Sequence, residues 1–233
     1  MVETNSQHQP NEDDTVVFLT RHGARIDSDD HRWLAKCSHN RANDPHLSPA
    51  GEIGAVELAQ KMKELQTAED GWKSLHIVSS PYIRCMETAH AVAQALNASI
   101  KVEPGIAEVN SSRRPDFLDA VELKQKFPSI DTSYIPAMNR EELSVEYSDG
   151  VCAQRSANVA RIVTERLGVK GGPILFVGHG ASCLGVAGQF GHGGYIGYTS
   201  LSKFVREGDN WKCVTFGDVS HLSDRQTSLD SAW

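Results

Sequence analysis

The chain has 233 residues, 39% of them hydrophobic, and carries a formal net charge of −7. This length and composition predict a single domain with one substantial hydrophobic core. The negative charge argues against nucleic acid and anionic membranes as partners, because both attract basic proteins, and no apolar run approaches the roughly 20 residues of a membrane span. The five cysteines show no metal-binding pair or disulfide pattern and the first residues resemble no targeting peptide, so we expect a cytoplasmic protein.

Strand and helix signals alternate along most of the chain. Residues 1–13 are polar and acidic and are expected to be disordered, while 220–233 are expected to form a polar, loosely held tail. Between them, residues 14–219 form the predicted domain. Two late segments, 198–207 and 211–218, have the character of an antiparallel hairpin. The remaining signals predict strands over 15–20, 75–80, 99–105 and 173–178, and helices over 47–66, 81–96, 117–127, 153–167 and 179–190.

The segment 47–66 carries the signals of a helix start and of one apolar helix face. Ser48 is a suitable N-cap, and Pro49 suits the first helical position because its missing N–H would have no partner there. One face of this helix carries Ile53, Val56, Ala59 and Met62. Alternating β and α segments of this kind predict an α/β fold, a three-layer α/β/α sandwich with a mostly parallel central sheet.

Arginine and histidine follow three of the predicted strands. Arg21, His22 and Arg25 come after the first strand, Arg84 comes after 75–80, and His179 comes after 173–178. The carboxyl ends of parallel strands share one edge of a sheet, so these side chains are expected to converge. Guanidinium groups match phosphate oxygens, a first helical turn favours anions, and a neutral imidazole can attack phosphorus. The pattern therefore predicts a phosphoryl site, with either histidine as nucleophile.

Each of these motifs is weak when taken alone. A histidine after a strand, or an arginine in a first helical turn, is usually structural, and His76 and His90 are assigned to that ordinary class. The stretch G-H-G-A-S-C at 178–183 resembles a dinucleotide-binding loop, but Cys183 replaces the third glycine. The histidines show no spacing typical of a metal site. The prediction depends on the same chemistry recurring after three strands.

Four motifs together resemble the histidine phosphatase superfamily, also called phosphoglycerate-mutase-like. They are T-R-H-G-A-R at 20–25, L-S-P-A-G at 47–51, S-S-P-Y-I-R-C-M-E-T-A at 79–89 and V-G-H-G at 177–180, within a match that runs from about residue 15 to 218. The resemblance implies a phosphoglycerate-mutase-like fold and a reaction that needs no metal or other cofactor. It is specific because these motifs recur in the family's order.

The same resemblance implies a role for each matching residue. His22 is the nucleophile that becomes phosphohistidine, and Arg21 and Arg84 bind the phosphoryl oxygens. His179 is the second histidine of the phosphate pocket, protonated beside the anion. Arg25 adds a third arginine, which is similar to the branch containing the TULA-type (UBASH-type) suppressors of T-cell receptor signalling and unlike most mutases.

The general acid is the least determined of the implied roles. The segment K-V-E-P-G-I-A-E-V at 101–109 resembles the part of TULA-type proteins that supplies the acid, which assigns the role to Glu108. Glu103 and Asp116 lie in the same region and stay open as alternatives. Segments 26–46 and 110–150 are expected to roof the pocket. The aromatic residues there that are candidates for contact with a substrate are Trp33, Tyr134 and Tyr147.

The resulting hypothesis is a metal-independent phosphomonoesterase that works through phosphohistidine. Its partner is a phosphate monoester, and phosphotyrosine, phosphosteroid and sugar phosphates all stay open as substrates. The alternatives are a cofactor-dependent phosphoglycerate mutase and a degenerate module that binds phosphate or a phosphoprotein without turnover. A homodimer is a common outcome for such folds, although no interface can be identified in the sequence.

Overall fold

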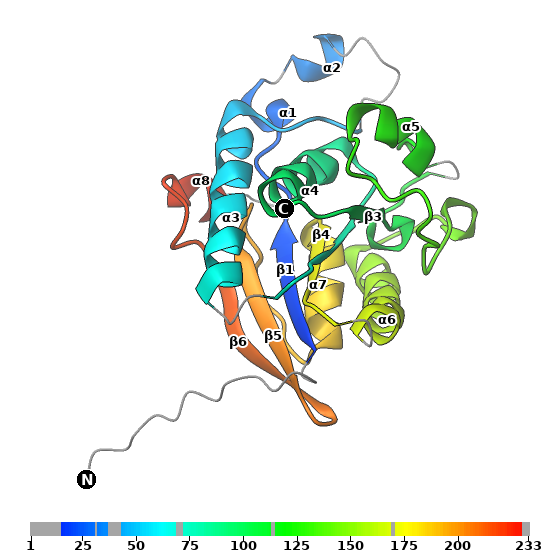
Figure 1. The fold of residues 1–233 in the computed structure, drawn as a ribbon. Helices are drawn as coiled ribbons and strands as arrows, with labels where there is room; N and C mark the ends of the chain where they lie inside the picture. The colour runs from blue at the N-terminus through cyan, green and yellow to red at the C-terminus, as the bar shows by residue number, and fades with distance from the viewer. Residues whose placement is uncertain are drawn as a thin grey trace.

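The computed structural model describes residues 15–30, 32–36, 43–68, 72–112, 115–168 and 171–229. At its centre is a six-stranded sheet in the order β3-β2-β4-β1-β5-β6 (Figure 1). The four strands β3, β2, β4 and β1 are parallel, whereas β5 and β6 run antiparallel to their neighbours. Their bounds are β1 Val16–Arg21, β2 His76–Ser79, β3 Ile100–Val102, β4 Ile174–Gly178, β5 Leu201–Glu207 and β6 Asn210–Asp218. The predicted disordered segment 1–13 lies outside the described residues.

Four long helices cover the two faces of this sheet. They are α3 (Pro49–Ala68) and α4 (Ile83–Leu96) on one face, and α6 (Asp149–Gly168) and α7 (Gly180–Gln189) on the other. None of the helices within the described ranges is long and apolar enough to cross a membrane. The shorter helices are α1 Ile26–Asp29, α2 Trp33–Lys36, α5 Ala120–Lys126, α8 Arg225–Leu229 and two 3-10 turns, η1 Pro104–Ile106 and η2 Arg140–Glu142.

Successive residues of β1 enter opposite cores. On β1, Phe18 packs in the cluster that contains Met86 of α4, while its neighbours Val17 and Leu19 pack in the cluster that contains Val163 of α6. Side chains of a strand alternate between the two faces of a sheet, so a strand covered on both faces becomes a continuous apolar run. The predicted three-layer α/β/α sandwich with a mostly parallel sheet and a late antiparallel hairpin is therefore confirmed.

The predicted face of α3 is buried only in part. Ala59 and Met62 are buried as expected, but Ile53 and Val56 are 56% and 64% exposed, and the helix also buries Leu58 together with small residues at its start. Gly51 lies so close to the loop after β1 that an added Cβ would be 2.2 Å from the carbonyl oxygen of Ala24. Contact with that loop sets the rotation of the helix. The spacing of large apolar residues could not show this, because the contact is made by a glycine.

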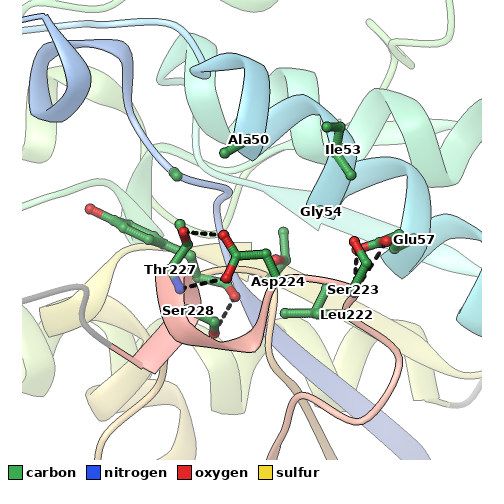
Figure 2. Close-up of a pocket in the computed structure, with 12 residues that line it drawn as sticks. Ala50, Ile53, Gly54, Glu57, Leu222, Ser223, Asp224, Thr227 and Ser228 are labelled. Carbon is green, nitrogen blue, oxygen red and sulfur yellow. Dashed lines mark hydrogen bonds between the residues drawn. The ribbon is translucent and has the colours of Figure 1, made fainter.

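The segment that begins at residue 220 contacts the body of the domain at Tyr198 and Glu57, within the residues that the structure describes. The Ser228 hydroxyl donates a hydrogen bond of 2.6 Å to the carbonyl of Tyr198, and the backbone N–H of Ser223 donates to the Glu57 carboxylate of α3. A small cavity of about 110 Å³ separates this segment from α3 (Figure 2). The C-terminal segment thus anchors the chain at Tyr198, close to the end of β1.

Candidate active site

The carboxyl ends of three neighbouring strands meet at one edge of the sheet. Strand β4 lies between β1 and β2, and the backbone N–H of His22, just after β1, donates to the carbonyl of Gly178 at the end of β4 over 3.0 Å. His179 follows at once, and its ring centroid is 5.2 Å from that of His22. Helix α4, which follows β2, adds Arg84 in its first turn. Three of the residues predicted to converge, His22, Arg84 and His179, therefore lie side by side.

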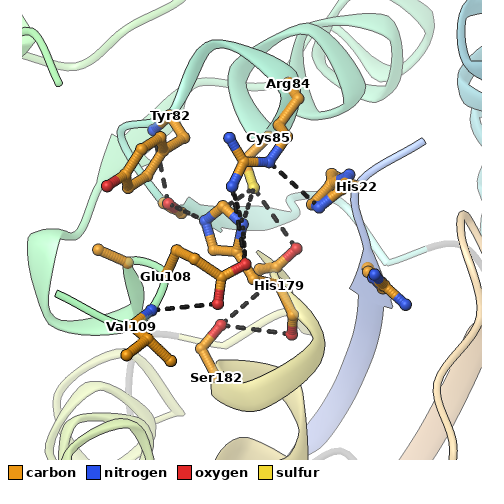
Figure 3. A network of polar contacts seen from close by, with 12 residues as sticks. His22, Tyr82, Arg84, Cys85, Glu108, Val109, His179 and Ser182 are labelled. Atoms are coloured by element: carbon orange, nitrogen blue, oxygen red, sulfur yellow. Dashed lines mark hydrogen bonds and ion pairs between the residues drawn. The ribbon is translucent and has the colours of Figure 1, made fainter. Parts of the chain in front are cut away.

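Arg84 lies at the centre of this cluster and is 2% exposed (Figure 3). Its Nε atom donates a hydrogen bond of 3.2 Å to Nε2 of His22, and its Nη2 atom donates one of 3.0 Å to Nδ1 of His179. The same Nη2 atom is 3.7 Å from a carboxylate oxygen of Glu108. One guanidinium group thus contacts both histidines and the carboxylate.

The His22 ring is a neutral imidazole with a defined tautomer. Its Nδ1 atom is 2.7 Å from the carbonyl oxygen of Gly23, so Nδ1 carries the proton because a carbonyl only accepts. The lone pair is then on Nε2, the atom that faces Arg84. Burial, followed by the positive charges of Arg84 and Arg21, lowers the pKa of His22 well below 6.5. A neutral imidazole nitrogen with an available lone pair is a competent nucleophile.

His179 is also neutral in this geometry, which differs from the protonated form that the family resemblance implies. Its Nδ1 atom accepts from Arg84, so Nε2 carries the proton and donates to the Ser80 hydroxyl over 2.7 Å. Burial, followed by the charge of Arg84, lowers the pKa of His179 well below 6.5. The guanidinium group already supplies the positive charge here, and a second one beside it is unfavourable.

Glu108 is the carboxylate that faces the two central residues. Its Oε2 atom is 3.5 Å from Nδ1 of His179 and 3.7 Å from Arg84, and its side chain is 31% exposed. Its Oε1 atom accepts from the backbone N–H of Val109 over 3.1 Å. The carboxylate therefore contacts the buried cluster and also keeps access to solvent.

The alternative acid Glu103 has a structural environment. It is fully buried and accepts hydrogen bonds from the Tyr134 hydroxyl and from the backbone N–H groups of Gly105, Ala137 and Met138. Burial raises its pKa, and these donors work in the opposite direction. Of the aromatic residues considered for substrate contact, Tyr134 is hydrogen-bonded to Glu103, and Tyr147 is 91% exposed. The other alternative, Asp116, lies on the wall of a cavity that Arg84 and Glu108 also line.

A cavity of about 430 Å³ opens beside the cluster. Arg84 and Glu108 belong to its wall, whereas His22, which is 1% exposed, does not line it. Segments 26–46 and 110–150 both contribute to the wall, the first through Trp33 among others. This volume accommodates the body of a small organic ligand. Among the residues that the structure describes, no three His, Cys, Asp or Glu side chains gather as possible metal ligands.

The two remaining arginines have different surroundings. Arg21 is 7% exposed, and its guanidinium carbon lies 4.4 Å from the ring centroid of Tyr198. Arg25 is on the cavity wall and forms a two-point ion pair with Asp27, in which Nε and Oδ1 are 2.9 Å apart. Arg21 is thus part of the buried cluster, while Arg25 is presented at its entrance.

Several residues that shape the site carry no signal in the sequence. Tyr198 packs against both Arg21 and His22, with a ring-centroid distance of 5.3 Å to His22. Asp44 is 1% exposed and accepts a hydrogen bond of 2.7 Å from the backbone N–H of Ile83, the first residue of α4. Both contacts join segments far apart in the chain, so no local motif indicates them. Asp27, two residues after Arg25, could have been proposed as its partner from proximity alone.

The chain matches a known protein family over most of its length. The model of the "Histidine phosphatase superfamily (branch 1)" matches residues 17–219. The chain is 28% identical over 207 residues to ubiquitin-associated and SH3 domain-containing protein B of Mus musculus, covering 75% of this chain and 32% of the relative. It is also 28% identical over 190 residues to ecdysteroid-phosphate phosphatase of Bombyx mori, covering 70% of this chain and 28% of that one. The chain thus spans about a third of the length of these curated relatives.

The crystal structure of the Bombyx mori ecdysone phosphate phosphatase, in complex with tungstate, superposes with a TM-score of 0.69 at 22% identity. The superposition covers 87% of this chain and 93% of that one. At this level of identity the likeness establishes the fold. Since the family model spans nearly all of the described body, the chain belongs to the histidine phosphatase superfamily, branch 1.

Proposed function

We propose that this domain is a phosphoric monoester hydrolase that transfers the phosphoryl group through His22. The observation that carries the proposal is the neutral His22 ring, with its Nε2 lone pair directed at the guanidinium of Arg84. Arg21 and Arg84 supply two buried positive charges beside it. A phosphate dianion is the ligand that such a group of charges favours. The family assignment and its phosphatase relatives support the same reaction class.

In the first step the ester enters from the cavity and its phosphoryl oxygens take the hydrogen bonds that Arg84 now makes to the two imidazoles. Nε2 of His22 attacks phosphorus and the bond from phosphorus to the ester oxygen breaks. Glu108 protonates that oxygen as the alcohol leaves. In the second step Glu108 removes a proton from water, which attacks phosphohistidine and releases inorganic phosphate. Each proton taken from Glu108 is thereby returned.

His179 changes its protonation state in this scheme. Its low pKa in the protein is caused by burial and by Arg84. A dianion nearby favours the charged form of an imidazole and so raises its pKa. Binding of the phosphoryl group therefore draws a proton onto Nδ1 of His179, the atom that accepts from Arg84 before the phosphoryl group binds. The protonated His179 implied by the family resemblance then belongs to the complex with substrate.

A panel of phosphate monoesters tests the proposal. Wild-type protein is expected to hydrolyse p-nitrophenyl phosphate, and comparison of a phosphotyrosine peptide, a steroid phosphate and a sugar phosphate would rank the substrate classes. His22→Ala should reduce kcat by at least about a thousandfold. The matched control is His76→Ala. His76 is the first residue of β2, at the end of the strand away from the cluster, and its ring is bonded to the carbonyl of Gly171.

Other outcomes would identify the alternatives. Isomerisation of 3-phosphoglycerate that depends on bisphosphoglycerate would identify a mutase. Binding of phosphate by wild-type protein without any turnover would identify a binding module. Equal activity of wild type and His22→Ala would exclude the proposed chemistry.

A further inference from the structure

A buried ion pair lies outside the histidine cluster. Arg155 of α6 and Glu146, from the loop before it, have side chains that are 8% and 2% exposed. Nε of Arg155 is 2.6 Å from one carboxylate oxygen of Glu146, and Nη2 is 2.9 Å from the other. Burial favours the neutral acid, but these bonds keep the pKa of Glu146 below its usual value, so the pair stays ionised. This two-point geometry fixes both side chains.

The ion pair holds the backbone on both sides of Glu108. The Arg155 guanidinium donates to the carbonyls of Gly105, Ala107 and Glu108 itself, over 2.8, 3.2 and 3.3 Å. On the other side, the Glu146 carboxylate accepts from the backbone N–H of Asn110 over 3.0 Å. The backbone N–H of Glu146 also donates to the carbonyl of Asn110 over 2.7 Å. The segment from 105 to 110 is thereby fixed at both ends.

The Glu108 side chain depends on this support. Its Oε1 atom accepts from the next residue in the chain, Val109, and that contact moves with the loop. The distances from its Oε2 atom to His179 and Arg84 are therefore set by where the backbone at 107–109 lies. Burying two charges is costly, and an apolar pair of similar size often stabilises a fold as well. A general acid, in contrast, gains from a backbone held at a defined position.

We propose that Arg155 and Glu146 are positioning residues that hold the 105–110 backbone so that the Glu108 carboxylate can protonate the leaving oxygen. The proposal rests on the function proposed above. Neither residue contacts the reacting atoms, and their effect passes through the main chain. Disturbing them should therefore weaken proton donation and leave the attack by His22 intact.

The choice of leaving group separates these two effects. An alkyl alcohol must be protonated as it leaves, whereas 2,4-dinitrophenolate is a stable anion and leaves without help. The measured quantity is kcat/KM, which reports the steps up to the departure of the leaving group. The two substrates are an alkyl phosphate and 2,4-dinitrophenyl phosphate.

The main variant is the double substitution Arg155→Met with Glu146→Gln, which leaves no buried charge unpaired. It is expected to lose about tenfold to a hundredfold in kcat/KM on the alkyl ester and less than about threefold on the dinitrophenyl ester. Arg155→Lys keeps a positive charge opposite Glu146 with fewer donors for the three carbonyls. Arg155→Lys should also lose more kcat/KM on the alkyl ester than on the dinitrophenyl ester, but by a smaller factor. It replaces the double variant in the test if that variant does not fold. The matched control is Arg161→Met, because Arg161 forms an exposed pair with Glu165 on the same helix.

Glu108→Gln provides the reference. Adding the double substitution to Glu108→Gln should lower kcat/KM on the alkyl ester little further, since the Glu108 carboxyl that the ion pair positions is already absent. The positioning role would be overturned if the double variant lost kcat/KM equally on both esters, or lost none. The proposed function would still stand in that case, provided that Glu108→Gln lowers kcat/KM more on the alkyl ester than on the dinitrophenyl ester. If Glu108→Gln does not discriminate, the acid assignment fails and the positioning role fails with it. A wild-type protein inactive on both esters would contradict the proposed function itself.

Discussion

Nε of Arg84 donates a hydrogen bond of 3.2 Å to Nε2 of His22, so the proposed phosphate-binding residue and the proposed nucleophile are in direct contact. The same guanidinium group bonds to His179. Its charge lowers the pKa of both rings, and its donors are the ones that a phosphoryl group would take over. In the proposed mechanism, protonation of the histidines and recognition of phosphate are therefore coupled through Arg84.

The first prediction concerns stability and pH. His22 and His179 have pKa values well below 6.5 in the folded protein, because of burial and Arg84, while the unfolded chain takes up these protons near pH 6.5. The unfolded state thus binds more protons as the pH falls, and the free energy of unfolding should decrease below pH 6.5 by up to about 1.4 kcal/mol per pH unit for each ring. Urea unfolding at pH 7, 6 and 5 measures this slope.

The control for this prediction is the double variant His22→Asn with His179→Asn. Without the two buried imidazoles, the free energy of unfolding should change less between pH 7 and pH 5. A wild-type stability that is flat over this range would contradict the neutral assignment of both rings.

The second prediction concerns Tyr198, whose ring lies against the Arg21 guanidinium at 4.4 Å. Tyr198→Leu removes the aromatic face, so Arg21 should hold its position less well. The expected result is a rise in KM for p-nitrophenyl phosphate, and in Ki for inorganic phosphate, of about threefold to thirtyfold. Tyr198→Phe keeps the ring and should stay close to wild type. If the leucine and phenylalanine variants bind phosphate equally well, the stacked ring has no part in binding.

The third prediction concerns the contact between α3 and the loop after β1. Gly51→Ala would place a methyl group 2.2 Å from the carbonyl oxygen of Ala24, a backbone atom that cannot rotate away. The helix or the loop must shift, and we expect a loss of about 1–3 kcal/mol in the free energy of unfolding together with reduced activity. Gly188→Ala on α7 is the matched control, since nothing lies within 4 Å of its added Cβ and alanine favours a helix. Equal stability of the two variants would show that the close contact is absent.

The sequence predicts most of the fold because its strands are local signals. Buried strands such as β4 are short apolar runs with both faces covered, and each is followed by a polar strand end. The convergence of His22 and His179 could be anticipated for the same reason, since parallel strands present their carboxyl ends at one edge. The face of α3 was predicted correctly at Ala59 and Met62 and incorrectly at Ile53 and Val56, near the end of the helix where Gly51 makes its close contact.

What the sequence could not decide depends on burial and on distant contacts. Glu103 and Glu108 have similar surroundings in the sequence, and only the fold shows that Glu103 is enclosed by four donors while Glu108 faces the cluster. The protonation state of His179 depends on the 3.0 Å contact with Arg84. The ion pair between Arg155 and Glu146 joins a helix to a loop and has no recognisable motif.

Trapping of a phosphoenzyme tests the proposed covalent step at His22. Wild-type protein is mixed with a labelled phosphate monoester, quenched in base within the first turnover, and examined by intact-mass and peptide mass spectrometry. The account predicts one phosphoryl group on His22, stable in base, lost in acid, and absent from His22→Ala. A phosphoryl group found on another residue, or full activity of His22→Ala with no trapped intermediate, would contradict it.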